Sequence, residues 1–225
     1  MPDFYYDEEA AERAVGFFPR FLKHVKGEHA GQPFHLLPWQ ADAVIRPLFG
    51  WKREDGSRKY RRVYVEVPRK NGKSQLAAGV GLYLTYSDDE PGAEVYSAAS
   101  DRDQAAIVFE AASSMVEESP DLLRRGRVYR RSIVIEKTRS SYKVLSSDVG
   151  TKHGLNAHGT IYDELHTQPN RALWDVLTTS VGARRQPVTF AITTAGFDRN
   201  SICYEQHDYA VKVLEGVIDL SLIHI

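Results

Sequence analysis

Apolar and polar positions follow two different periods along this chain. Segment 62–67 alternates β-branched and polar residues and predicts a strand, and the Ala- and Leu-rich segment 74–86 that follows predicts a helix. The pair recurs at once, with a predicted strand over 93–98 and a predicted helix over 100–118. This order of strand, helix, strand and helix is typical of parallel βαβ units.

Further segments extend this pattern at both ends. A helix over 8–25 is predicted to pack on the rest of the chain, and a second helical stretch is predicted between Trp39 and Phe49. The remaining predicted elements are a hairpin of 132–136 and 141–146 near the sheet edge, strands at 160–162 and 188–192, and helices over 170–181 and 201–215. No flexible linker separates them, so the pattern predicts one α/β domain with a mostly parallel central sheet flanked by helices.

Composition sets limits on this domain. The chain has 225 residues, of which 42% are hydrophobic, and this is enough for one good core or two small ones. The 29 Lys and Arg nearly balance the 30 Asp and Glu, so no whole-chain field attracts a polyanion and any such site is local. One local excess lies in 52–73, with nine basic and three acidic residues. It indicates either a phosphate-facing loop or a solvated surface loop.

Other features exclude several classes of protein. The single Cys203 cannot form an internal disulfide and is interpreted as a half-buried helical thiol. Nothing in the acidic N-terminal segment resembles a signal peptide, and no apolar run approaches the ~20 residues that cross a bilayer. His153, His158 and His166 lack the spacing of a metal site. The sequence therefore predicts an intracellular protein that does not span a membrane.

The sharpest chemical signal lies between the strand over 62–67 and the next helix. A phosphate loop needs a glycine so that the backbone can approach phosphate oxygens, a lysine that reaches the β and γ phosphates, and a hydroxyl for Mg²⁺. Gly72, Lys73 and Ser74 fill these places, although Val67 stands where the usual pattern has its first glycine. The alternative is an ordinary helix N-terminus with a surface lysine.

A phosphate loop predicts a carboxylate pair at the end of another strand. Asp163 and Glu164 follow the predicted strand 160–162. Asp163 is expected to hold the metal, and Glu164 is expected to polarise the attacking water. Taken alone, such a pair is more often a charge pair at a helix N-terminus than a catalytic site. Together with the lysine loop, the catalytic interpretation is favoured.

Two weaker signals accompany these motifs. Thr193 and Thr194 follow the predicted strand 188–192, and at the carboxyl edge of a parallel sheet their hydroxyls would lie beside a bound γ-phosphate. The amide of Gln40 can bind both the donor and the acceptor of an adenine edge. By themselves the threonines are compatible with a simple cap at a strand end, and Gln40 with a surface residue.

Together these motifs resemble those of the large terminase subunit of tailed bacteriophages, over about 34–216. The segments that carry the resemblance are Pro38-Trp39-Gln40, Pro68-Arg69-Lys70-Asn71-Gly72-Lys73-Ser74, Ser100-Asp101-Arg102-Asp103-Gln104-Ala105, His153-Gly154-Leu155-Asn156, Tyr162-Asp163-Glu164-Leu165-His166 and Ile192-Thr193-Thr194-Ala195-Gly196. The resemblance implies a three-layer P-loop NTPase fold of the RecA-like, additional-strand (ASCE) type, with ATP and Mg²⁺ as cofactors.

The resemblance also implies roles for the residues around the nucleotide. It places Gln40 on the adenine-reading motif, and Thr193 and Thr194 on the motif that couples hydrolysis to movement. Members of the family act as rings, so an arginine from a neighbouring subunit is expected to complete each site. Arg139, in the predicted hairpin turn, is the candidate for this arginine.

Catalysis and metal binding are assigned in the same way. Glu164, Lys73 and Arg69 are expected to act in catalysis, Arg69 because family members carry a basic residue near the phosphates. Ser74 and Asp163 are expected to hold Mg²⁺. The residues expected to bind the nucleotide are Gln40, Pro68, Arg69, Lys70, Asn71, Gly72, Lys73, Ser74, Asp163, Thr193 and Thr194.

By this resemblance, the expected activity is ATP hydrolysis that drives double-stranded DNA into a preformed capsid. The expected partners are double-stranded DNA, the portal protein, the small terminase subunit and further copies of the chain in a ring on the prohead, in the host-cell cytoplasm and with no membrane. Residues 1–30 are expected to form an N-terminal helical segment and 31–219 the ATPase domain, with the family's C-terminal nuclease domain absent. Segment 220–225 resembles a translated sequencing adapter and is interpreted as an artefactual tail, with a short natural strand as the alternative.

Two other functions stay open at this point. Asp163-Glu164-Leu165-His166 matches an Asp-Glu-x-His box, and Thr193-Thr194-Ala195 resembles the third motif of superfamily-2 helicases, so a helicase-like DNA translocase is one alternative. The other is a non-enzymatic portal- or capsid-docking module that keeps an inert nucleotide fold.

Overall fold

The computed structural model describes residues 4–99, 102–146, 154–168, 170–182, 184–196, 198–218 and 222–224. Ser100 and His153, which belong to the predicted motifs, lie outside the described residues. In chain order the elements are β1 (Phe4–Tyr6), α1 (Glu8–Phe21), the π-helix η1 (Gln40–Ile45), α2 (Arg46–Gly50), β2 (Trp51–Arg53), β3 (Arg62–Glu66), α3 (Lys73–Tyr86), β4 (Glu94–Ala99), α4 (Arg102–Glu117), α5 (Pro120–Arg125), β5 (Arg127–Tyr129), β6 (Ser132–Ile135), β7 (Ser140–Ser146), β8 (Gly159–Asp163), the 3₁₀ helix η2 (Leu165–Thr167), α6 (Ala172–Thr179), β9 (Val188–Thr193), α7 (Ile202–Leu214) and β10 (Leu222–His224).

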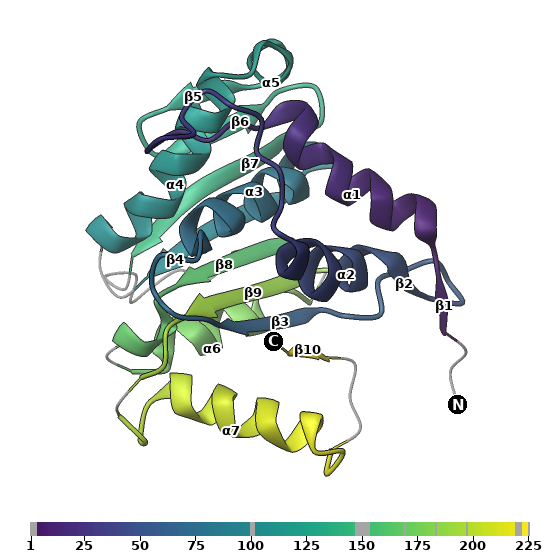
Figure 1. The fold of residues 1–225 in the computed structure, drawn as a ribbon, viewed down its shortest axis with the longest axis vertical. Coiled ribbons are helices and arrows are strands. Elements are labelled where there is room, and N and C mark those ends of the chain that lie inside the picture. Colours follow the sequence, from purple (N-terminus) through teal and green to yellow (C-terminus); the bar gives the residue numbers. More distant parts are fainter. Residues whose placement is uncertain are drawn as a thin grey trace.

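An eight-stranded sheet, ordered β10-β3-β9-β8-β4-β7-β6-β5, forms the middle layer (Figure 1). The strands from β10 to β7 are parallel, and β6 and β5 continue antiparallel at one edge. In this register Glu66 lies opposite Thr193, and Asp163 lies opposite Ile192. Because β3, β8 and β9 are parallel, the loops that follow them meet at the carboxyl edge of the sheet.

Helices cover both faces of the sheet and make three layers. Val63 and Val65 of β3 belong to a core that they share with α1, α2, α3 and α4, whereas Tyr64 belongs to a second core with α6 and α7. Successive residues of a strand point to opposite faces, so β3 contributes to both cores. The predicted three-layer α/β fold is confirmed.

Helix α3 packs closely because two of its residues lack a side chain. A Cβ atom added at Gly79 would lie 2.4 Å from the ring of Phe18 in α1, and one added at Gly81 would lie 2.8 Å from the ring of Tyr142 in β7. The two aromatic rings therefore occupy the space that side chains at these positions would need. This contact fixes α3, and with it the residues at its N-terminus, against the sheet.

The first predicted helix is shorter than the pattern indicated. The prediction of 8–25 was wrong at its end, because α1 stops at Phe21 and Leu22 is extended. The carbonyl of Leu22 accepts a hydrogen bond from the N–H of Phe34 (2.9 Å), and Lys23 forms an isolated antiparallel bridge with Pro33. The chain thus folds back on itself directly after α1, and this long-range pairing replaces the last predicted turn of helix.

The predicted hairpin is more deeply integrated than expected. Its second strand, β7, pairs antiparallel with β6 and also parallel with β4, so it lies inside the sheet and only β6 and β5 lie outward of it. Neither β5 nor α5 was predicted. Ser119-Pro120 does end the preceding helix as predicted, but Pro120 also begins α5, a position that proline favours.

A buried ionic cluster ties together the amino edge of the sheet. The guanidinium of Arg58 donates to both carboxylate oxygens of Asp88 (3.2 and 2.7 Å), and Nε2 of His158 lies 2.6 Å from Oδ2 of Asp88. Arg58 also donates to the carbonyl of Gln186 (3.2 Å). These four residues precede β3, β4, β8 and β9, so one cluster links the starts of four neighbouring strands.

Candidate functional site

The loop between β3 and α3 is a compact turn that ends on a helix N-terminus. Lys70 and Gly72 both have positive φ, of 68° and 73°, which gives the loop its tight curvature. The side chain of Asn71 donates to the carbonyls of Pro68 (3.0 Å) and Arg69 (3.3 Å) and holds the turn from within. The first N–H groups of α3 therefore open onto the loop, an arrangement that suits an anion.

Lys73, the first residue of α3, is buried, with 7% of its surface exposed. Its Nζ donates to the carbonyls of Val67 (3.4 Å) and Pro68 (3.3 Å). Both distances are long for hydrogen bonds from a charged group. The ammonium is thus only weakly held by the protein, and it keeps the capacity to bind a further, stronger acceptor.

Ser74 and Asp163 join the loop to the end of β8. The hydroxyl of Ser74 donates to Oδ2 of Asp163 at 3.0 Å. Burial, followed by the charge of Glu164, raises the pKa of Asp163 to about 6, although Ser74 and Lys73 act in the opposite direction. A carboxylate in this environment gains most from a nearby cation, because a cation would favour its ionised form.

The Ser74–Asp163 pair suits a hard divalent cation. Mg²⁺ takes oxygen ligands, keeps several waters and is commonly held by one or two carboxylates together with substrate phosphates. Within the described residues no group of three or more His, Cys, Asp or Glu could hold a metal ion. A hydroxyl and one carboxylate beside a phosphate loop fit a Mg²⁺ ion that is shared with a nucleotide.

The second carboxylate, Glu164, lies in an unusual backbone conformation. Its φ and ψ are 51° and 53°, a left-handed conformation that is strained for a residue with a side chain. The hydroxyl of Thr194 donates to its Oε2 at 3.4 Å, and Nδ1 of His166 lies 3.2 Å from the same oxygen. The loops after β8 and β9 are therefore connected through the Glu164 carboxylate.

Gln40 lies against the phosphate loop from the side of η1. It is 1% exposed, and its Oε1 accepts a hydrogen bond from the N–H of Leu37 (3.0 Å). A Cβ atom at Gly72 would lie 3.3 Å from its Nε2. The structure thus brings Gln40 next to Gly72, and its predicted contact with an adenine edge stays a prediction.

A cavity of about 500 Å³ opens beside the phosphate loop. Its lining includes Lys73, Ser74 and Glu164 from the predicted site. The sequence did not predict a second part of the lining, which comes from the segment after α1 and consists of His24, Lys26, Gly27, Glu28 and His29. Nδ1 of His24 lies 2.9 Å from Oε1 of Gln75 in α3, so this wall is attached to the helix that carries the lysine.

The two predicted arginines lie in different places. Arg69 lines this cavity and also a neighbouring one of about 550 Å³, which His166 and Thr194 line as well. Arg139 has a positive φ of 59° and lies in the turn before β7, at the amino end of that parallel strand. The structure therefore groups Arg69 with the site at the carboxyl ends of the strands. Arg139 lies at the amino ends of the strands, on the opposite side of the same subunit.

The basic stretch 52–73 serves two purposes. Arg58 is buried in the ionic cluster, and Nζ of Lys59 lies over the rings of Phe4 (4.4 Å) and Trp51 (5.0 Å). Only the part of the stretch around the phosphate loop lines the cavity. The charge excess thus reflects packing as well as a polyanion site.

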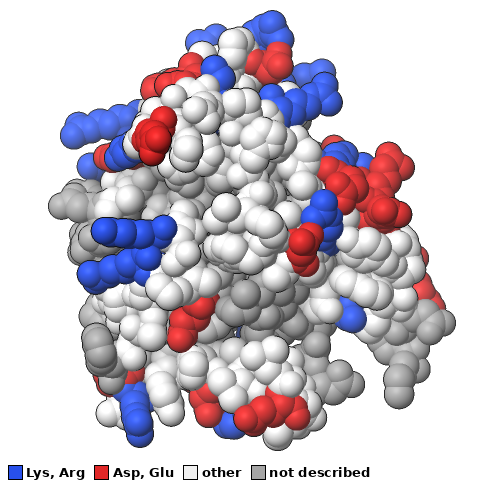
Figure 2. Space-filling model, viewed as in Figure 1, with Lys and Arg blue, Asp and Glu red and all other residues white. Residues whose placement is uncertain are grey.

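A second basic segment was overlooked in the sequence. Residues 124–143 contain eight basic residues and one acidic residue, and they form the end of α5, then β5, β6 and the start of β7. Figure 2 shows Lys and Arg side chains, in blue, projecting at the end of the molecule that carries α5. We call this segment the basic ribbon; its basic residues are Arg124, Arg125, Arg127, Arg130, Arg131, Lys137, Arg139 and Lys143.

A lysine loop, a hydrogen-bonded Ser–Asp pair and a second acidic residue on the carboxyl edge of a parallel sheet define a P-loop ATPase with a RecA-like fold. The family model described as "Terminase large subunit, ATPase domain" matches residues 38–212. The chain belongs to this family and is an ATPase domain of the large-terminase type.

Individual relatives agree with this assignment. The chain is 30% identical to the terminase large subunit of Enterobacteria phage HK97 over 206 residues, which cover 89% of the chain and 40% of that subunit. It superposes on the crystal structure of the HK97 large terminase with a TM-score of 0.77 and 29% identity, covering 96% of the chain and 43% of that structure. The large terminase of a thermophilic bacteriophage, solved in complex with ATP-γ-S, shares the fold (TM-score 0.50, 12% identity, 74% of the chain and 38% of that structure). The chain therefore spans about two fifths of the length of these relatives.

Among the residues that the structure describes, none forms a helix both long enough and apolar enough to cross a bilayer.

Proposed function

We propose that this domain binds ATP with Mg²⁺ and hydrolyses it to drive double-stranded DNA into a preformed phage capsid. The observation that carries the proposal is the hydrogen bond of 3.0 Å between Ser74 and Asp163, which joins the phosphate loop to the acidic pair. Loop, hydroxyl and carboxylate are the parts that a P-loop ATPase needs to hold a metal-bound triphosphate.

The phosphate loop would hold the triphosphate. Backbone N–H groups at the start of α3 point to the phosphates, and the weakly held ammonium of Lys73 exchanges its two long carbonyl contacts for phosphate oxygens. Arg69, which lines the same cavity, adds positive charge. Ser74 and Asp163 would hold Mg²⁺, which neutralises charge on the phosphate oxygens.

Glu164 would orient the attacking water. It lines the cavity beside Lys73 and Ser74, so its carboxylate is in reach of a water next to a bound phosphate. The contact with Thr194 links that carboxylate to the end of β9, and through it Thr193 and Thr194 would report phosphate release. Positioning and electrostatic stabilisation account for this chemistry without a covalent intermediate.

The basic ribbon supports the DNA part of the proposal. Arg130 and Arg131 form the two-residue turn between β5 and β6, and Ser132 is the first residue after this turn. Lys143 of β7 pairs with Ser132, so these three basic residues lie at the same end of the ribbon. All three are exposed, and Tyr129 beside them is 52% exposed. A concentrated, exposed positive surface suits the phosphate backbone of DNA.

The remaining parts of the proposal come from the family. The domain would act within the full-length subunit, in a ring of copies on the prohead in the host-cell cytoplasm, with the portal protein and the small terminase subunit as partners. A neighbouring subunit would supply an arginine to each site, and the exposed Arg139 is a candidate for this role.

ATP turnover of the full-length protein tests the site. Lys73→Ala is expected to abolish turnover, and Glu164→Gln is expected to stop hydrolysis while ATP binding persists. Lys212→Ala is the matched control, because Lys212 is an exposed residue of α7 that pairs with Asp208. Undiminished turnover in either site variant would refute the assignment, and a lack of Mg²⁺-dependent ATP binding in the unmodified protein would favour the inert docking module.

DNA affinity as a function of salt concentration tests the basic ribbon. Combined alanine substitution of Arg130, Arg131 and Lys143 should weaken binding and reduce the slope of log K against log salt by about 0.9 for each phosphate that is no longer bound. Lys212→Ala again serves as the control. An unchanged slope in the triple variant would rule out this surface, and ATP-dependent strand separation by the unmodified protein would favour the helicase alternative.

A further inference from the structure

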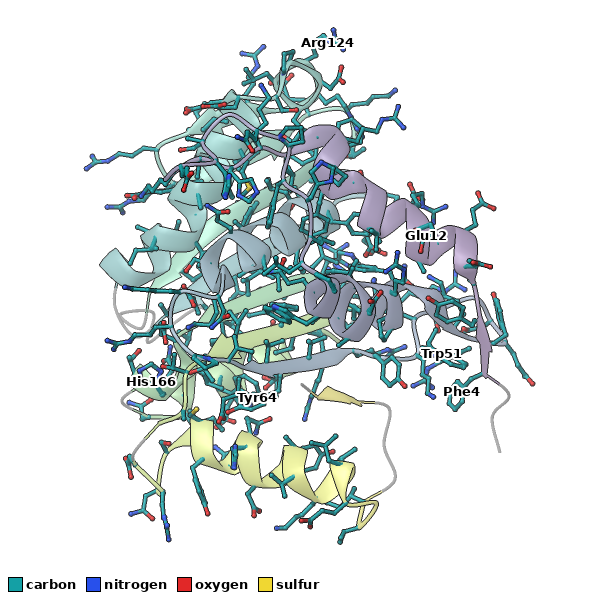
Figure 3. All side chains as sticks on the ribbon, in the orientation of Figure 1. Phe4, Glu12, Trp51, Tyr64, Arg124 and His166 are labelled. Carbon is teal, nitrogen blue, oxygen red and sulfur yellow. The ribbon has the colours of Figure 1, made fainter. Side chains whose placement is uncertain are left out.

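His166, in η2 directly after the acidic pair, bridges two loops of the site. Its Nδ1 lies 3.0 Å from Oγ1 of Thr193, 3.2 Å from Oε2 of Glu164 and 3.5 Å from Oγ1 of Thr194. Its backbone N–H also donates to Oγ1 of Thr193 (3.3 Å). Figure 3 shows His166 at the edge of the sheet where β3, β8 and β9 end.

The neighbouring hydroxyls determine where the imidazole proton lies. The Thr193 hydroxyl donates its only hydrogen to the carbonyl of Thr194 (2.9 Å), so towards His166 it can act only as an acceptor. The Glu164 carboxylate is also an acceptor, and its Oε2 receives the hydroxyl of Thr194 as well. Both close neighbours of Nδ1 are thus acceptors, and Nδ1 must carry a hydrogen.

This hydrogen connects the acidic residue to β9. Nδ1–H donates to Oγ1 of Thr193 and lies in ion-pair contact with Oε2 of Glu164 (3.2 Å), and Thr194 donates to the same Glu164 oxygen. The carboxylate of Glu164, a residue with a strained left-handed backbone, is therefore contacted by side chains from η2 and from the end of β9. Through these contacts, a displacement of β9 would act on the orientation of this carboxylate.

The surroundings of His166 argue against a purely structural role. Its side chain is 22% exposed and borders the cavity of about 550 Å³ together with Arg69 and Thr194, whereas the core residues of β8 and β9 are fully buried. Removing a partly exposed ring costs little packing. The contacts of Nδ1 with Thr193 and Glu164 are its distinctive contribution.

We propose that His166 is a positioning residue, whose Nδ1–H sets the orientation of Glu164 and couples it to Thr193 and Thr194. This inference rests on the proposed function, in which Glu164 orients the attacking water. Through this ring, a change in the orientation of Glu164 at the phosphate site would reach β9. Hydrolysis would thereby be coupled to a movement of β9 and of the loop after it. No bond to substrate is required of His166 itself.

Three substitutions at His166 separate the role of Nδ1 from that of the ring. Asparagine places an amide nitrogen near the position of Nδ1, glutamine places one near Nε2, and alanine has neither. For the full-length protein with Mg²⁺ and ATP, His166→Ala and His166→Gln are expected to lower kcat about tenfold or more with KM changed less than about threefold. His166→Asn is expected to recover most of kcat. His35→Ala, at an exposed histidine outside the site, serves as the control.

Two further measurements distinguish coupling from loss of fold. DNA translocated per ATP hydrolysed should fall in His166→Ala, and adding Thr194→Val to that variant should cause little further loss, because both changes break the same connection. Thermal unfolding midpoints should agree between the alanine and asparagine variants.

Several outcomes would overturn the proposal. Equal loss of kcat in the asparagine and alanine variants would do so, as would a rise in KM alone, fully additive effects with Thr194→Val, or turnover equal to that of the unmodified protein in all three variants. Failure of the proposed function itself is recognised separately, because Lys73→Ala would then retain turnover.

Discussion

Replacing Asp163 by asparagine is expected to stabilise the protein while it removes a proposed ligand for Mg²⁺. In the nucleotide-free protein the ionised carboxylate is buried at the end of β8 beside another acid, Glu164. Asparagine has nearly the same shape and no charge. Its carbonyl can accept the N–H of Glu164, which now donates to Asp163 (3.0 Å), and its amide can donate to the hydroxyl of Ser74.

The magnitude follows from the pKa of Asp163. Burial and the charge of Glu164 raise this pKa from 3.8 to about 6 in the folded protein. At pH 8 a difference of this size corresponds to about 3 kcal/mol of lost stability. Because the asparagine amide does not satisfy the site perfectly, we expect Asp163→Asn to raise the free energy of unfolding at pH 8 by about 1–3 kcal/mol.

The effect must depend on pH with a definite sign. Between pH 3.8 and about 6 the folded protein binds the Asp163 proton more tightly than the unfolded chain does, so the contribution of this group to stability falls as pH rises and levels off above that range. The asparagine variant lacks this titration. Its advantage over the unmodified protein should therefore be largest at pH 8 and should shrink by about 1.5 kcal/mol at pH 5.

Urea unfolding at pH 5 and pH 8, with a chelator and without nucleotide, measures this difference. Chelation matters because a bound cation would favour the ionised carboxylate and mask the effect. Asp208→Asn, at an exposed ion pair of α7, is the matched control and should change the free energy of unfolding by less than about 0.5 kcal/mol at either pH. The reasoning fails if Asp163→Asn is less stable than the unmodified protein at pH 8, or if its advantage is the same at both pH values.

Three further predictions concern the frame that holds the site, and urea unfolding measures each. Arg58→Ala should lower the free energy of unfolding by about 3–5 kcal/mol, because it removes the guanidinium partner of a buried carboxylate and leaves Asp88 only its contact with His158; a decrease below about 1 kcal/mol would contradict this. Combining Arg58→Ala with Asp163→Asn should give additive changes within about 0.5 kcal/mol, since the two sites lie at opposite edges of the sheet, and a larger deviation would show coupling between the edges. Gly79→Ala should destabilise the protein although alanine favours helix, because the new Cβ would lie 2.4 Å from the ring of Phe18; a gain in stability would show that the ring can move aside.

Local signals made the phosphate loop and its flanks predictable. The strand over 62–67, the following helix and the turn between them depend on periodicity and on residues next to each other in the chain, and the structure has β3 and α3 there. The proximity of Ser74 to Asp163 also followed, because the carboxyl ends of parallel strands share an edge. These inferences required only the alternation of elements.

Contacts between distant segments could not be predicted in the same way. Lys26 and His29 reach the cavity because the chain folds back after α1, and that turn depends on backbone pairing between Leu22 and Phe34. Arg58 resembled one more basic residue of a charged loop, since its partner Asp88 comes 30 positions later. Charge counts along a sequence cannot distinguish a buried ion pair from a solvated side chain.

The amino and carboxyl ends of the parallel strands differ in their electrostatic arrangement. At the amino edge, the Arg58 cluster connects the starts of four strands with charges that compensate one another. At the carboxyl edge of the same strands lie an acid whose pKa is raised by burial and an acid in a strained backbone conformation. Both features cost stability, and a bound cation would offset the first by favouring the ionised form of Asp163. The compensated cluster at the amino edge offsets part of this cost, which is consistent with a domain that tolerates an unfavourable arrangement at the edge where its ligand is proposed to bind.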